Sequence, residues 1–286
     1  QCLVGSEMCI RDRYYTGATD GSSSLTETGD ALYIESGYND RDITVAVKGG
    51  SFTSAKAQAV RMFIENGETT TVKREVKVTG GTFSSDVSAY VAEGYVQNEN
   101  GTVEQLGETN AVAKIDDTYY KTLAEAVAAA KDDKTVTLLK DAELTSTLNL
   151  AKNITIDGQG KYTIKAANSF TVGSDNKTNC VLYVSGEVTL KDVTVNGNEK
   201  CRVIFCDKGK LTIDGATITN GKAPSFIGGV YMTSSASFEM KSGSITGNKN
   251  AKGYQNDEYL QYSSDLWIGA NANGALTAIN GGTIGN

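Results

Sequence analysis

The segment VKVTGGTF at residues 76–83 decides the fold, because the chain repeats it with variations. VAVKGGSF occupies residues 45–52, TAINGGTI occupies 277–284, and a looser LTIDGATI occupies 211–218. Each copy reads as a short apolar strand, a corner of small residues and the start of a second strand. Glycine adopts backbone angles that other residues resist, so these glycines turn the chain from one sheet face to the next. The repeat predicts an all-β fold.

The spacing of the repeats predicts a stack of coils. The apolar anchors Leu190, Ile213, Met240 and Ile279 follow one another at intervals of 23, 27 and 39 residues. Self-similar segments with strand-like alternation at this spacing are typical of a β-solenoid. Two or three short strands in each coil would stack at about 4.8 Å on those of the next coil.

Stacking also predicts which side chains meet. The expected inward columns are Leu182/Phe205/Met232, Cys180/Val203/Val230, Leu190/Ile213/Met240/Ile279 and Val195/Ile218/Ile245/Ile284. One expected outward column is Asp157, Lys191, Asp214 and Lys241. Opposite charges on neighbouring strands stabilise a sheet, so this column is interpreted as structural rather than catalytic.

The repeat is interrupted after residue 83, where a first module is expected to end. Ser85 can cap a short helix at 86–92 that stops at Gly94. Strands near 95–96 and 102–103 could then form a hairpin, because Asn-Gly at 100–101 favours a tight turn. We therefore predict that residues 14–106 are the C-terminal end of a first module.

Residues 107–286 are expected to form a second module that begins with a cap. Thr122 and Glu125 have the spacing of a capping box, and Leu123 and Val127 fall on one face of a helix predicted at 122–131. Such a helix would cover the apolar end of the stack. Strands at 135–139, 146–150 and 154–156 are expected to follow.

A family resemblance becomes visible in the segment AVAKIDDTYYKTLAEAVAAAKDDKTVTLLKD at 111–141, followed by NITIDGQGKYTI at 153–164. It resembles the N-terminal cap and first coils of right-handed parallel β-helix proteins of the pectate-lyase-like superfamily. The preceding VTGGTFSSDVSAYVAEGY at 78–95 resembles segments of large multi-module bacterial surface proteins. The resemblance implies a right-handed parallel β-helix in two modules. It does not choose an activity, because this superfamily includes both enzymes and adhesins.

The two ends of the sequence are expected to be incomplete. Residues 3–13, LVGSEMCIRDR, resemble the codon-by-codon translation of a transposase-based sequencing adapter, so residues 1–13 are expected to be non-native and to mark a metagenomic fragment. The final GGTIGN at 281–286 stops within a repeat. We therefore expect that the second module is truncated at its C-terminus.

Composition excludes several functions. The net charge is −7 without a Lys/Arg cluster, which argues against nucleic-acid binding. No apolar stretch reaches the ~18–20 residues that a membrane span requires. The chain has no His, so nucleophilic sites that use His and His-containing zinc sites are excluded. No cofactor and no metal site are predicted.

Catalytic residues are not apparent in the sequence, and no catalytic residue is assigned. Lyase chemistry would require acids around Ca²⁺ beside a basic residue, and Arg202 with Asp207 is the only arginine-centred candidate in the second module. A glycosidase requires only two carboxylates, and none of the many acids stands out. Cys180, Cys201 and Cys206 are expected to be free thiols, with Cys180 buried.

The longest interval between anchors contains the functional candidate. Its segment KNAKGYQNDEYLQYSSDLW at 249–267 is an insertion relative to its neighbours. The candidate glycan-binding residues are Tyr254, Asp257, Glu258, Tyr259, Tyr262 and Trp267. If Leu266 and Ile268 point inward, alternation turns Trp267 outward beside the insertion. Aromatic faces beside carboxylates suit sugar rings, although the simpler interpretation is that the tyrosines cover the side of the stack.

These observations favour a non-catalytic segment of an extracellular or cell-surface bacterial protein, acting as an adhesin, a stalk or a glycan-binding surface. The expected partner is a polysaccharide or a host or cell-surface glycan. The alternatives are a carbohydrate-active lyase or glycoside hydrolase with part of its site outside this sequence, and a spacer without a ligand.

Overall fold

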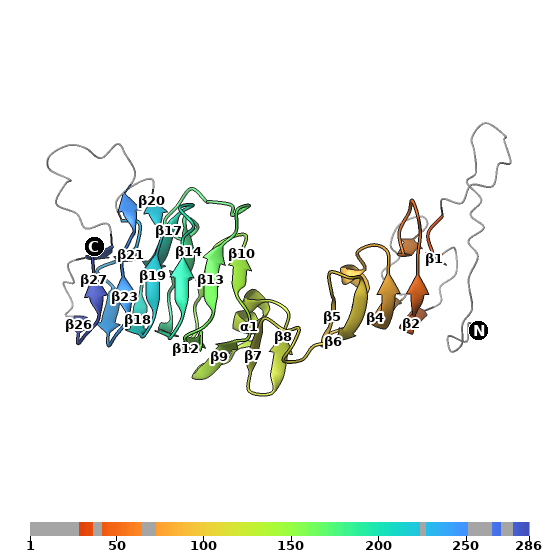
Figure 1. Cartoon of the computed structure of the whole chain (residues 1–286), viewed down its shortest axis with the longest axis horizontal. Helices are drawn as coiled ribbons and strands as arrows, with labels where there is room; N and C mark the ends of the chain where they lie inside the picture. The colour runs from red at the N-terminus through yellow and green to blue at the C-terminus, as the bar shows by residue number, and fades with distance from the viewer. Residues whose placement is uncertain are drawn as a thin grey trace. The chain divides into compact units, whose positions relative to one another are not determined.

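The computed structural model describes residues 29–36, 42–64, 73–223, 227–250, 265–269 and 277–285. The chain divides into two compact units, which comprise residues 1–110 and 111–286. The described residues of both units consist mainly of β-strands (Figure 1). Most strand pairs of unit 2 are parallel, whereas unit 1 has both parallel and antiparallel pairs. Among the described residues, no helix has the length and apolar character needed to cross a membrane.

The described residues of unit 1 form two sheets. One pairs β1 (Leu32–Ser36) with β3 (Val60–Ile64) in parallel. The other has the order β2 (Ile43–Phe52), β4 (Arg74–Phe83), β6 (Thr102–Gln105) and β5 (Tyr95–Gln97). The repeated segments are β2 and β4, which pair in parallel, and the register shifts between Val47 and Ser51. Gly50 and Gly81 have φ values of 104° and 115°, so glycine is required where these strands bend.

The helix predicted at 86–92 is wrong, because the segment forms only a 3-10 turn, η1 (Ser88–Tyr90). Ser85 does not cap it: its hydroxyl accepts a hydrogen bond from the backbone N–H of Ala59 at 2.7 Å. The N–H of Ala92 donates to the carbonyl of Val78, so sheet-type bonding replaces the helical pattern beyond η1. The hairpin that follows is confirmed by the antiparallel pairing of β5 with β6.

In its described residues, unit 2 contains three large sheets, here named I, II and III. Sheet I has the order β8 (Thr118–Tyr120), β7 (Ala113–Ile115), β9 (Lys134–Leu138), β12 (Ile154–Asp157), β15 (Glu187–Lys191), β18 (Gly209–Asp214), β22 (Ala236–Met240) and β26 (Thr277–Ile279). Sheet II has the order β10 (Ala142–Leu144), β13 (Thr163–Ala166), β16 (Thr194–Asn196), β19 (Thr217–Thr219), β23 (Ser244–Ile245) and β27 (Thr283–Ile284). Sheet III has the order β11 (Leu148–Leu150), β14 (Cys180–Val184), β17 (Arg202–Cys206), β21 (Val230–Met232) and β25 (Leu266–Ile268).

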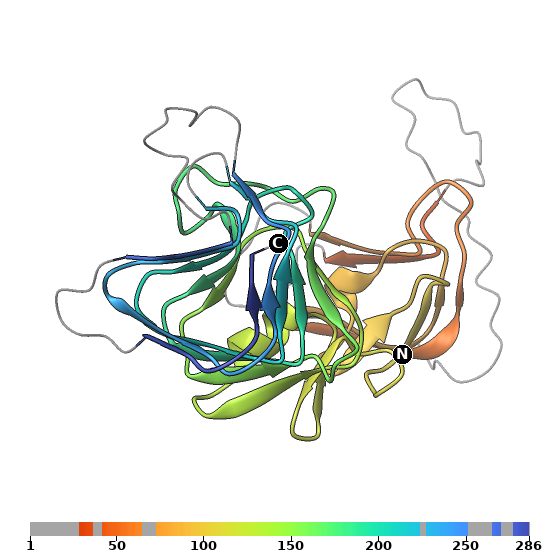
Figure 2. The ribbon, with the colours of Figure 1, turned by 60° about the vertical axis from the view of Figure 1, so that its left-hand side comes forward.

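Successive strands of unit 2 visit sheets I, II and III in turn, and each strand pairs with its counterpart one coil earlier and one coil later. Pairing is parallel except where the cap strand β7 pairs with β8 and β9. Figure 2 shows the coils obliquely along their stacking direction, with strands on three sides of the interior. A further small parallel pair, β20 (Lys222–Ala223) with β24 (Lys249–Asn250), lies in the connections from sheet II to sheet III.

Two of the predicted inward columns are confirmed. In sheet I, Leu190 pairs with Ile213, Ile213 with Met240, and Met240 with Ile279. In sheet II, the column of Val195, Ile218, Ile245 and Ile284 follows the predicted order. Ile279 and Ile284 are 55% and 37% exposed, because they lie on the last described strand of their sheets.

The two columns predicted for sheet III are wrong. Leu182 pairs with Ile204, and Ile204 with Val230, whereas Phe205 pairs with Tyr183. Cys180 pairs with Arg202 rather than with Val203. Every residue of β17 is buried, and its charged residue, Arg202, has the same alternation as the inward Ile204, so the sequence RVIFC does not identify the outward direction. A shift of one residue therefore exchanged the two faces of the strand.

The predicted cap helix is confirmed as α1 (Leu123–Ala129), which ends two residues before the expected position. The Thr122 hydroxyl accepts a hydrogen bond from the backbone N–H of Glu125 at 3.1 Å, as an N-cap does. Leu123, Ala126 and Val127 are buried in the core. Lys152 Nζ donates to the carbonyl of Ala128 at 2.7 Å, which satisfies a free acceptor where the helix ends.

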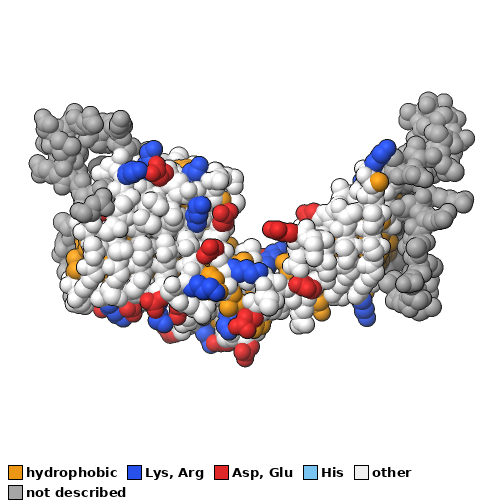
Figure 3. Space-filling view, viewed as in Figure 1, with side chains coloured by type: hydrophobic (Ala, Val, Ile, Leu, Met, Phe, Trp, Pro, Cys, Tyr) orange, Lys and Arg blue, Asp and Glu red, His pale blue; other side chains and the backbone are white. Residues whose placement is uncertain are grey.

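The charged outward column also forms ion pairs. Lys191 Nζ lies 2.8 Å from Asp157 Oδ2, and Lys241 Nζ lies 3.5 Å from Asp214 Oδ2. In contrast, the surface over β19 and β23 of sheet II shows few charges (Figure 3). Charge therefore concentrates on particular faces of unit 2.

Candidate functional site

The long connections of unit 2 gather at the corner between sheets II and III. Residues 167–179 join β13 to β14, residues 220–229 join β19 to β21, and residues 246–265 join β23 to β25. The connections at the other corners are shorter than these three, as at 185–186 and 192–193. Long connections on one side of a repeat structure commonly carry its binding function, so this corner and sheet III beside it form the candidate site.

Sheet III presents a row of aromatic rings on its outward side, here named the aromatic row. Its members are Tyr183, Phe205, Tyr231 and Trp267, one on each of four neighbouring strands. Adjacent ring centroids are separated by 6.0, 5.4 and 4.6 Å in that order. Phe205 is only 4% exposed, whereas the other three rings are partly exposed. The row is therefore a surface of stacked rings whose second member is covered.

Arg202 holds the corner together beside the aromatic row. Its side chain is 1% exposed, and its guanidinium carbon lies 4.8 Å from the ring centroid of Tyr231 and 5.8 Å from that of Phe205. Nε donates to the carbonyl of Ile227 at 2.9 Å, and Nη1 donates to Asn176 Oδ1 at 3.1 Å. Burial lowers the pKa of this guanidinium. Arg202 thus links two of the long connections to sheet III.

A polar group lies at the Tyr183 end of the row. The Tyr183 hydroxyl donates to Asp207 Oδ2 at 3.3 Å, and Lys177 Nζ lies 3.2 Å from the same oxygen. Lys177 Nζ also lies 5.5 Å from the Tyr183 ring centroid. The hydrogen bond with Asp207 raises the pKa of Lys177. Rings and hydrogen-bonding groups therefore stand side by side, as recognition of a ligand with both apolar and hydroxyl surfaces requires.

Arg202 and Asp207, the arginine-centred pair considered from sequence, bind other groups: Arg202 faces the connections and Asp207 faces Lys177. Within the described residues, no three His, Cys, Asp or Glu side chains come together as a metal-binding group.

The structure places one of the six sequence-predicted site residues. Trp267 lies on β25 in register with Tyr231, while Leu266 and Ile268 pack against the core, so it points outward as predicted. The other five lie outside the described residues: Tyr254, Asp257, Glu258, Tyr259 and Tyr262.

Sequence reasoning missed the other members of the row, although the repeats contain a signal. The triplets LYV at 182–184, IFC at 204–206, VYM at 230–232 and LWI at 266–268 each place an aromatic residue between two apolar ones. Aligning these triplets would have placed all four rings in one outward column.

The three free thiols belong to the same region. Cys180, Cys201 and Cys206 are all fully buried. Burial raises the pKa of each of these thiols to about 12. A thiol with such a pKa stays protonated near neutral pH and is a poor nucleophile, so these cysteines contribute to packing.

Comparisons of this chain with protein-family models, with curated proteins and with solved structures found no match in any of the three.

Proposed function

We propose that unit 2 is a right-handed parallel β-helix, in which each passage through sheets I, II and III is one coil. The repeated order of the sheets and the confirmed inward columns support this proposal. The hand is inferred from the strong preference for right-handed connections between parallel strands.

We further propose that the chain is a non-catalytic segment of an extracellular bacterial surface protein, with an adhesin or stalk role, and that it binds glycan at the aromatic row. The observation that carries this proposal is the outward stack of rings beside the corner where the long connections gather. Sugar rings have apolar C–H faces that pack on aromatic rings, while their hydroxyls require hydrogen-bonding groups nearby. Asp207 and Lys177 supply such groups at one end of the row.

The test is retention of the whole chain in native gels that contain single polysaccharides, including neutral and acidic ones. Retention by at least one polysaccharide is expected. Trp267→Ala and Tyr231→Ala should each weaken it by about fivefold, because each removes roughly 1 kcal/mol of ring stacking. Tyr119→Ala on β8 is the matched control, because it removes a tyrosine from outside sheet III.

Folding must be separated from binding, because Tyr231 is half-buried. Tyr231→Leu keeps an apolar cover and removes the flat ring, so it should retain the unfolding midpoint and lose the polysaccharide. If both Trp267→Ala and Tyr231→Leu keep full retention, the aromatic row is not the binding site. Shortening of a retained polysaccharide during the assay would contradict the non-catalytic role and favour the lyase or glycoside hydrolase alternative.

A further inference from the structure

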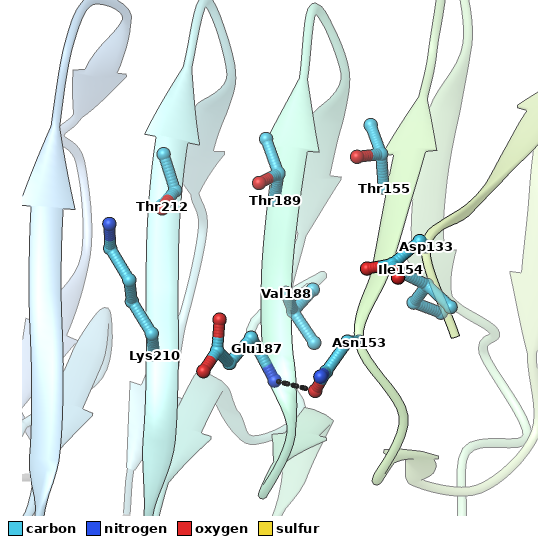
Figure 4. Close-up of a pocket in the computed structure, with 9 residues that line it drawn as sticks. All are labelled: Asp133, Asn153, Ile154, Thr155, Glu187, Val188, Thr189, Lys210 and Thr212. Carbon is cyan, nitrogen blue, oxygen red and sulfur yellow. Dashed lines mark hydrogen bonds between the residues drawn. The ribbon is translucent and has the colours of Figure 1, made fainter.

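A second surface of unit 2 has the properties of a binding site, and it lies on sheet I rather than on sheet III. A groove of about 300 Å³ runs across the outward sides of β12, β15 and β18 (Figure 4). Its lining is mainly polar and includes Thr155, Thr189, Thr212, Asp133, Glu187 and Lys210. The groove crosses the strands, so a ligand within it would extend from coil to coil.

A row of hydroxyls forms the floor of the groove. Thr155 pairs with Thr189, and Thr189 pairs with Thr212, so one hydroxyl is presented on each strand at intervals of about 4.8 Å. Among the described residues, none of these three hydroxyls makes a hydrogen bond to the protein. Thr212 is only 5% exposed as a whole residue, but its hydroxyl is not among the fully buried side-chain atoms that lack a partner, so the groove reaches it. The hydroxyl row is therefore prepared to exchange hydrogen bonds with a ligand.

Acidic and amide groups line one side of the hydroxyl row. Two hydrogen bonds hold Asn153 in place. Its side-chain Oδ1 accepts from the backbone N–H of Glu187 at 3.0 Å, and its backbone N–H donates to Asp132 Oδ1 at 2.9 Å. Within the described part of the chain, the carboxylates of Asp133 and Glu187 have no ion-pair partner. They are therefore available to a ligand that donates hydrogen bonds or carries positive charge.

The cation of the groove is neutralised. Lys210 Nζ lies 2.6 Å from Glu239 Oε2, on the strand beyond Thr212. The hydrogen bond from Lys210 lowers the pKa of Glu239, so this pair stays ionised near neutral pH. With Lys210 paired and two carboxylates unpaired, the groove carries an excess of negative charge, which disfavours carboxylate and phosphate ligands.

Backbone groups do not compete for the ligand. The strands under the groove are paired on both sides, β12 with β9 and β15, and β15 with β18, so their N–H and C=O groups are used within the sheet. A peptide could not add to this surface as a further strand. An extended ligand with hydroxyl and amino groups would match the threonine hydroxyls and the carboxylates that line the groove.

We propose that this groove binds an extended polysaccharide that carries hydroxyl and amino groups and lacks carboxylates. The hydroxyl row contacts the sugar hydroxyls, and Glu187 and Asp133 bind protonated amino groups. This site is independent of the aromatic row, because the two surfaces are on different sheets and share no residue.

The experiment is isothermal titration of the whole chain with three oligosaccharide probes of equal length. The probes are oligomers of glucosamine, of N-acetylglucosamine and of galacturonate. The glucosamine oligomer should bind most tightly and the galacturonate oligomer should not bind. Thr189→Val should weaken glucosamine binding by about fivefold to tenfold, which corresponds to one lost hydrogen bond. Glu187→Gln should reduce the preference for glucosamine over N-acetylglucosamine at least several-fold.

Thr194→Val is the matched control, because it removes the same hydroxyl from a strand of sheet II, outside the groove. Thr189→Val should have the same effect on glucosamine binding when it is made in a Trp267→Ala background, which separates this site from the aromatic row. The proposal is overturned by absence of glucosamine binding, by equal binding of galacturonate, or by an equal effect of Thr189→Val and Thr194→Val. Loss of binding in Trp267→Ala with none in Thr189→Val would assign the sugar to the aromatic row instead.

Discussion

Sheets I and III of unit 2 have similar apolar inward sides, but their outward sides differ in chemistry. Both contribute apolar columns to one core, as Leu190 and Ile213 do from sheet I and Leu182 and Ile204 do from sheet III. Outward, sheet III is covered by stacked rings and by Arg202, whereas sheet I presents hydroxyls and charges to a groove. The difference shows that the inward side fixes the coil, and that the outward side is free to carry either packing or polar chemistry.

The two sheets should differ in how much their outward residues contribute to stability. An outward residue of sheet III should contribute to folding almost as a core residue does, because the rings bury one another. An outward residue of sheet I should contribute little, since solvent replaces its contacts.

The largest expected effect is that of Phe205→Ala, which should lower the free energy of unfolding by about 3 kcal/mol. The side chain is 4% exposed between Tyr183 and Tyr231, so its removal leaves a cavity. Thr189→Ala, at an outward position of sheet I, should change the free energy of unfolding by about 0.5 kcal/mol or less. Urea unfolding of both variants measures the contrast, and equal losses would refute the distinction between the two sheets.

Arg202→Met should have the next largest effect, a loss of about 2 kcal/mol. Methionine keeps much of the apolar volume, but the carbonyl of Ile227 and the amide of Asn176 lose their donor. Urea unfolding gives the loss, with Lys210→Met in sheet I as the control for removing a cation. A midpoint unchanged from that of the original chain would show that Arg202 is not needed to hold the corner.

A smaller change in the free energy of unfolding is expected from pH, and it arises from Cys206 on β17 of sheet III. Burial raises the pKa of Cys206 to about 12 from an ordinary value of 9.0. The Cys206 thiol therefore ionises at lower pH in the unfolded chain than in the folded chain. The contribution of the protonated thiol to the free energy of unfolding is complete below pH 9 and is lost as pH rises towards 12. At pH 10 the loss should be about 1 kcal/mol relative to Cys206→Ala. Urea midpoints of both proteins above and below pH 9 measure it, and parallel pH profiles would contradict it.

The smallest effect is expected on the charged column of sheet I. Lys191 pairs with Asp157 at 2.8 Å, and the hydrogen bond raises the pKa of Lys191, but the lysine side chain is exposed. Lys191→Met should lower the unfolding midpoint only slightly, and salt should remove the difference because it screens exposed charges. A large effect that persists in high salt would mean that this pair behaves like the covered groups of sheet III.

Sequence alone predicted the parts of unit 2 in which strands alternate between apolar and polar residues. The segment at 187–191, EVTLK, shows which side chains face inward, so the columns of sheet I were assigned correctly. The segment at 202–206, RVIFC, is buried throughout, and the register was misplaced by one residue there. Alternation carries information only when one side of the strand meets solvent.

The candidate site was predicted only in part for related reasons. Trp267 was identified because it follows an obvious insertion, whereas Tyr183 and Tyr231 are at ordinary strand positions. The groove of sheet I was not predicted, because threonine is common on outward strand positions and sequence does not report where a sheet is hollowed. Whether the Thr212 hydroxyl finds a hydrogen-bond partner in the protein depends on residues from other coils, which the sequence around Thr212 does not reveal.

The pairing of each coil only with the coils before and after it has a genetic consequence. Leu190 and Ile213 occupy equivalent positions in consecutive coils, separated by 23 residues. Unequal recombination that removed the codons of residues 191–213 would join two equivalent positions and leave the neighbouring coils in register. Stability in such repeats is close to a sum over units and their interfaces, so a lineage could shorten or lengthen this molecule coil by coil while retaining its fold. Copy number would then be a heritable way to set how far the protein extends.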